Sequence, residues 1–160
     1  MNGNNRVPGI RAGEEWRYHG GLWRGAPEST WFKYVMVNGD DAETTKIPLG
    51  TVMKETTDGS YLPMEDADIL IGTAGLPGAR LAIVADTTGK TGTTETVEGA
   101  NGLETVKKPW TILVGIMGEV EQDRLIVGGK LWGDLTDEQR QGLRAQLESW
   151  NFNLVYVMQG

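Results

Sequence analysis

The chain has 160 residues, contains no cysteine and has a single histidine, His19. The absence of thiols excludes disulfide frameworks, cysteine-ligated zinc sites and thiol nucleophiles. One imidazole argues against a histidine-rich metal site and against a serine–histidine–aspartate triad. We therefore expect neither a metal nor another cofactor, and no catalytic residues.

Long apolar runs are also missing. No segment approaches the roughly 18 consecutive apolar residues that a membrane-spanning helix needs. The N-terminal sequence Met-Asn-Gly-Asn-Asn-Arg is not followed by an apolar run, so we expect no signal peptide and synthesis in the cytoplasm. We expect no contact with a membrane.

Basic residues are few, since 15 Lys and Arg stand against 22 Asp and Glu, for a net charge of −7. Neutralising phosphates requires clustered basic side chains, so we expect no nucleic-acid partner. The chain has 23 glycines and 39% hydrophobic residues. This composition is typical of a globular protein rich in strands and turns rather than of a disordered one.

The first 29 residues differ from the rest of the chain. Residues 1–33 carry five basic and three acidic side chains and three of the six tryptophans. Glycines and a proline interrupt any helix or strand period there, which predicts an irregular arm over residues 1–29 before a β-rich domain over residues 30–160. Disordered tails are poor in aromatic residues, so we expect this region to pack either on the body of its own chain or on a partner. Trp, Tyr and Arg are the usual anchors of protein interfaces, which favours a partner as one of these two alternatives. The expected contact residues are Trp16, Tyr18, Trp23, Arg24, Trp31 and Lys33.

Strand patterns begin at residue 30. An aromatic and β-branched run covers residues 30–37, and Asp58-Gly59 predicts a tight hairpin turn between residues 52–55 and 61–64. The apolar runs 69–71 and 81–85 predict two short buried strands. Residues 110–117 are apolar on both faces apart from Thr111, as in a central strand, and residues 118–126 predict a polar bend.

A single helix is expected near the C-terminus. Thr136 and Gln139 have the spacing of a capping box, and Leu143, Leu147 and Trp150 form one apolar stripe. Asn151 is a typical left-handed stop, and residues 154–158 predict a closing strand. The fold class is therefore mainly β or α+β, with one helix and a final strand.

Residues 87–106 are mostly Thr, Gly and Glu and bury little, which predicts an exposed loop or flap; we draw this exposed segment as far as residue 109. Gly89-Lys90-Thr91 resembles the end of a phosphate-binding loop. The upstream glycine of that motif is replaced by Val84, and no apolar helix follows, which argues against a nucleotide site.

Two groups of acidic residues are candidates for a metal-binding or a catalytic site. The sequence Glu65-Asp66-Ala67-Asp68 lacks the spacing of a calcium loop and is interpreted as a solvated turn. Glu119 and Glu121 share one face of an extended strand, as a glycosidase pair would, although a solvated bend is the simpler interpretation. We expect no enzymatic activity, and a small hydrolase that uses these two glutamates stays an alternative.

From about residue 46 to the C-terminus the chain resembles the lambda-type head decoration proteins of tailed bacteriophages. The resemblance follows a series of segments that keep the family's order and spacing. They are Leu49-Gly50-Thr51-Val52-Met53, Ser60-Tyr61-Leu62-Pro63-Met64, residues 79–86, residues 112–120, Leu131-Trp132, Thr136-Asp137-Glu138-Gln139, residues 143–147 and residues 154–157.

The resemblance implies a capsid-stabilising protein of the virion, located on the outer capsid surface. It implies a homotrimer at three-fold or quasi-three-fold sites of the expanded head, with the N-terminal arm bound to the major capsid protein. The alternative is a phage fibre or a glycan- or receptor-binding module, in which Trp16, Trp23 and Trp31 form a platform that stacks on sugars.

Overall fold

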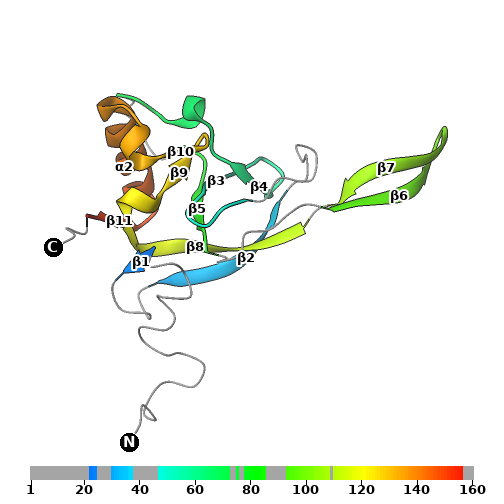
Figure 1. Cartoon of the computed structure of the whole chain (residues 1–160), viewed down its shortest axis with the longest axis horizontal. Helices are drawn as coiled ribbons and strands as arrows, with labels where there is room; N and C mark the ends of the chain where they lie inside the picture. The colour runs from blue at the N-terminus through cyan, green and yellow to red at the C-terminus, as the bar shows by residue number, and fades with distance from the viewer. Residues whose placement is uncertain are drawn as a thin grey trace, which may run out of the picture.

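The computed structural model describes residues 22–24, 30–37, 47–72, 75, 78–85, 93–108 and 110–156. Within these ranges the protein is built mostly of strands, with one α-helix near the C-terminus and a closing strand after it, which confirms the predicted fold class (Figure 1). The elements in chain order are β1 (Trp23–Arg24), β2 (Trp31–Val37), β3 (Val52–Glu55), β4 (Tyr61–Pro63), η3 (Asp66–Asp68), β5 (Leu81–Val84), β6 (Thr93–Gly99), β7 (Gly102–Lys108), β8 (Trp110–Glu121), η4 (Gln122–Arg124), β9 (Ile126–Val127), β10 (Lys130–Leu131), η5 (Trp132–Asp134), α2 (Asp137–Ser149) and β11 (Phe152–Val155).

Five strands close on themselves into a small barrel in the order β8-β2-β4-β3-β5, because β5 pairs again with β8. Each of the five strands contributes to one buried apolar cluster, so this cluster fills the inside of the barrel. Its members on the strands are Val35, Val37, Met53, Tyr61, Ala82, Val84, Ile112 and Val114.

A second and larger core lies on the outer side of the barrel wall. Leu81 and Ile83 of β5 point into it, whereas Ala82 and Val84 between them point into the barrel. This alternation explains why the whole of β5 is apolar and buried on both faces. Helix α2 covers this core with Leu143.

Helix α2 begins where the capping box predicts. The hydroxyl of Thr136 accepts a hydrogen bond from the backbone N–H of Gln139 at 3.1 Å, and the Gln139 side chain accepts one from the N–H of Thr136 at 3.0 Å. Asn151 follows with a φ of 67°, which confirms the left-handed stop. The chain then enters β11, which pairs in parallel with the end of β8.

The hairpin between β3 and β4 is confirmed, as are the strands at 30–37, 81–85 and 110–117. The predicted strand at residues 69–71 is wrong, because this segment is irregular and its backbone bonds to helix α2 instead. The amide side chain of Gln146 accepts from the N–H of Leu70 at 3.0 Å and donates to the carbonyl of Asp68 at 3.2 Å. The expected polar bend after residue 117 begins later, since β8 continues to Glu121.

At residues 93–108 the structure has a hairpin in place of a loop. Strands β6 and β7 pair antiparallel from Thr93 opposite Lys108 to Gly99 opposite Gly102, and the hairpin projects away from the barrel beyond the start of β8, as the flap alternative requires (Figure 1). Asn101-Gly102 at the turn is typical of a tight hairpin. Residues 101–105 are exposed, as the expectation of an exposed segment required.

Candidate functional site

The structure places the expected partner-binding residues differently. Trp31 and Lys33 lie on β2 and are exposed, with 59% of Trp31 accessible to solvent. Arg24 lies in β1, opposite Glu119 in the register with β8. Trp16 and Tyr18 are outside the described residues. The structure therefore presents two of the six expected side chains, Trp31 and Lys33, on one strand.

Trp23 is not on the surface, and the expectation that its side chain contacts a partner is wrong. The indole is fully buried in the outer core, with its ring centroid 5.2 Å from that of Phe32 and 6.3 Å from that of Phe152. Gly115 of β8 makes room for it, because a Cβ atom at that position would stand 2.0 Å from the indole. Trp23 is a core residue, so the proposed sugar platform of three tryptophans loses its middle member.

The burial of Leu22 and Trp23 also moves the boundary of the folded body. Both side chains are fully buried, and the carbonyl of Leu22 accepts a hydrogen bond from the N–H of Glu121 at 2.7 Å. The predicted boundary at residue 29 therefore assigns two core residues, Leu22 and Trp23, to the arm. Residues 22–24 belong to the body, and the rest of the segment 1–29 lies outside the described residues.

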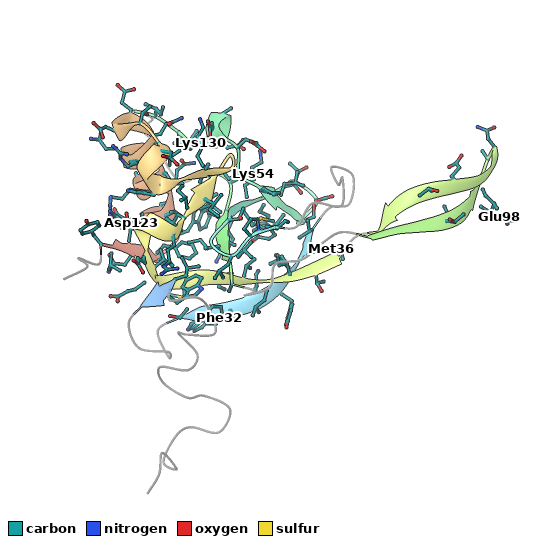
Figure 2. All side chains as sticks on the ribbon, viewed as in Figure 1. Phe32, Met36, Lys54, Glu98, Asp123 and Lys130 are labelled. Carbon is teal, nitrogen blue, oxygen red and sulfur yellow. The ribbon has the colours of Figure 1, made fainter. Side chains whose placement is uncertain are left out.

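The neighbours of Trp31 and Lys33 on β2 enlarge the exposed surface. Phe32, Tyr34 and Met36 are 37%, 68% and 53% exposed, whereas Val35 and Val37 point into the barrel. These three residues were missed as contact candidates, although the alternation of the strand with two valines was the signal for an outward face. Trp31 and Lys33 alternate with them and lie on the same side of the strand as the two valines. We call the exposed residues of both sides, Trp31, Phe32, Lys33, Tyr34 and Met36, the β2 surface; Figure 2 labels Phe32 and Met36.

The two backbone edges of β2 differ in their strand partners. Strand β2 pairs with β8 along its whole length, from Trp31 to Val37. Its pairing with β4 is confined to Val37 opposite Tyr61. Over the described part of the chain, no strand pairs with residues 33–36 on the side away from β8. The open edge and the exposed aromatic side chains lie on the same strand, which suits contact with an extended segment of another protein.

The two glutamates considered for hydrolysis have separate partners. The side chain of Glu121 is 8% exposed and lies 3.3 Å from the guanidinium of Arg124, measured from Oε2 to Nε. Oε1 of Glu119 accepts a hydrogen bond from the side-chain amide of Asn153 at 3.3 Å. Both carboxylates thus support the junction of β8 with η4 and β11.

The acidic turn around η3 is connected to two strands by ion pairs. Lys54 of β3 donates to Asp68 at 2.7 Å, and Lys130 of β10 donates to Asp66 at 2.7 Å. Partial burial raises the pKa of Asp68, but the bonds from Lys54 and from the N–H of Glu65 outweigh it and hold that pKa below its usual value. The Asp66 carboxylate raises the pKa of Lys130. Across the described ranges, no cluster of His, Asp and Glu has the arrangement of a metal site.

No family model, curated protein or solved structure matches the chain. In the part of the chain that the structure covers, no helix has both the length and the apolar character needed to cross a membrane.

Proposed function

We propose that this protein is a capsid decoration protein, which binds the outer surface of the expanded phage head as a homotrimer and stabilises the shell against the pressure of packaged DNA. The sites are the three-fold or quasi-three-fold positions, and the partner is the major capsid protein. The resemblance from residue 46 onward supports this proposal. The observation that carries it is the β2 surface, where several large apolar side chains of one strand are exposed.

The β2 surface has the composition of an interface core. Trp31 and Tyr34 are both more than half exposed, and aromatic residues dominate the energetics of protein contacts. Surface-exposed apolar residues are ordinary when single, but Phe32, Tyr34 and Met36 share the outward side of β2 and form a patch of the kind that marks interaction sites. Trp31 and Lys33 are exposed on the other side of the strand, where Lys33 adds a positive charge on a chain whose net charge is −7.

Stabilisation of a shell needs no chemistry. A protein that binds the expanded shell more tightly than the unexpanded one stabilises the expanded state by mass action. Three linked copies of one weak contact reach high avidity, since the second and third contacts form at high effective concentration. The acidic body is suited to facing solvent, where net charge keeps particles apart.

The test is co-sedimentation with empty expanded heads of the phage that encodes the chain. The truncation removes residues 1–21 only, because Leu22 and Trp23 are part of the core. We expect this variant to stay folded and to lose most of its binding. Trp31→Ala should weaken binding at least about thirtyfold, as for an interface hot spot of about 2 kcal/mol.

Tyr156→Ala is the matched control, because Tyr156 is 64% exposed against 59% for Trp31 and lies outside β2. This control should bind heads as the wild type does. Full binding by both the truncated protein and Trp31→Ala would refute the assigned surface. Failure of the wild type to bind any head would refute the proposed function.

A further inference from the structure

The hairpin formed by β6 and β7 has no packing partner among the described elements of its own chain. Its strands pair with each other over seven positions, and no other described element makes substantial contact with either of them. An isolated two-stranded hairpin is only marginally stable in water. Contact with another molecule would therefore stabilise it, and its side chains indicate which kind.

Leu103 near the tip is the most exposed large apolar side chain of the described residues, at 76%. One carboxylate lies beside it, since Glu98 is directly opposite Leu103 in the strand register and shares its face of the hairpin. Glu104 follows in sequence and lies on the other face. No basic residue occurs between residues 96 and 105. The tip thus offers one apolar side chain next to a negative charge.

A groove of about 320 Å³ lies on the body of the same molecule. Leu22, Leu49, Ile126 and Leu131 line its apolar part, and Asp123 and Arg124 of η4 lie at its polar side. A volume of about 150 Å³ suffices for benzene, so a leucine side chain fits with room to spare. Arg124 is 52% exposed, and its internal partner Glu121 is almost buried.

The hairpin and the groove cannot meet within one chain. Figure 2 places Glu98 of the hairpin and Asp123 of the groove near opposite ends of the long axis of the molecule. Two different complementary patches at opposite ends are what a head-to-tail contact between copies requires, and such a contact forms a ring when its rotation closes. The charge of Glu98 is opposite to that of Arg124, so this pair would attract. Asp123 beside Arg124 carries the same charge as Glu98 and would repel it.

We infer that the β6–β7 hairpin of one copy inserts Leu103 into the Leu131 groove of a second copy, with Glu98 directed at Arg124. The inference rests on the trimer of the proposed function and assigns its interface. This contact is separate from the β2 surface, so self-association and shell binding are measured independently.

Light scattering on the free protein provides the first test. The wild type should be a trimer, and Leu103→Asp or Leu131→Asp should weaken self-association at least tenfold. Leu103→Met keeps an apolar side chain and should stay trimeric. Ile71→Asp is the matched control for Leu131→Asp, since Ile71 is 48% exposed against 49% for Leu131 and lies outside the groove.

Mixing the two variants tests the head-to-tail geometry itself. Leu103→Asp copies retain an intact groove, and Leu131→Asp copies retain an intact hairpin. At high concentration the mixture should therefore form a 1:1 two-chain species that neither variant forms alone. A contact of hairpin with hairpin or of groove with groove would give no such complementation.

Circular dichroism checks that each variant is folded. If Leu131→Asp unfolds, Asp123→Asn decides instead, because removing this carboxylate should tighten association and an unchanged affinity overturns the inference. Trimers that persist in Leu103→Asp overturn the assigned contact and leave the proposed function standing. A wild type that stays monomeric at all concentrations overturns both the contact and the trimer, while head binding is judged by co-sedimentation.

Discussion

Trp23→Ala tests whether this tryptophan works inside the protein or on its surface. Its side chain is fully buried and contacts the rings of Phe32 and Phe152. Truncating a buried tryptophan removes a large apolar area and leaves a cavity, which costs about 3–5 kcal/mol. For a chain of this length that corresponds to a fall in Tm of roughly 6–20 °C.

Gly115 allows the same contact to be measured from the other side. A Cβ at this position would stand 2.0 Å from the indole of Trp23, so Gly115→Ala should destabilise the protein by about 1–3 kcal/mol through overpacking. In the Trp23→Ala background the clashing ring is absent. The cost of Gly115→Ala should therefore largely vanish there, which appears as a coupling energy in a double-mutant cycle.

Urea unfolding followed by circular dichroism measures all four proteins of this cycle. Trp31→Ala is the control, since its side chain is 59% exposed and its loss should change the free energy of unfolding by no more than about 0.5 kcal/mol. The packing argument is refuted if Trp23→Ala is as stable as the wild type. It is also refuted if the two substitutions at the contact are simply additive.

Three further predictions concern the framework of the fold. Hydrogen bonds from the hydroxyls of Ser60 and Thr56 and from the N–H of Ser60 lower the pKa of Asp58 from 3.8 to about 2. The stability that this carboxylate contributes is therefore present above pH 4 and is lost as the pH falls towards 2. The difference in Tm between the wild type and Asp58→Asn should shrink over that range, as thermal melts at each pH measure. Gly142→Ala should destabilise α2 although alanine favours helices by about 1 kcal/mol, because its Cβ would lie 2.5 Å from the carbonyl oxygen of Leu70; a higher Tm would contradict this. Thr136→Ala should cost about 1 kcal/mol in urea unfolding through loss of the N-cap, whereas Thr136→Ser should restore most of it.

The features that were predicted correctly depend on neighbours in the chain. The turn at Asp58-Gly59 and the cap at Thr136 each involve groups within about four residues, so the local sequence contains all the interacting partners. The apolar character of residues 81–85 and 110–117 likewise indicated strands, and residues 81–85 are buried on both faces, whereas Leu113, Ile116 and Met117 are half-buried. On the candidate surface, residue types alone indicated Trp31 and Lys33, and the valines of β2 indicated its inner face.

The errors arose where distant segments decide the outcome. Residues 69–71 are as apolar as a strand, but hydrogen bonds to Gln146 hold their backbone against a helix instead. Trp23 has the composition of an interface anchor, and only the space above Gly115 on β8 turns it into a core residue. Composition and local pattern therefore determined the fold class, the helix and its cap, because these follow from short-range hydrogen bonds and side-chain periodicity. Which tryptophan is buried, and that the Leu103 hairpin and the Leu131 groove lie at opposite ends, follow from long-range strand pairing, so only the tertiary structure decided them.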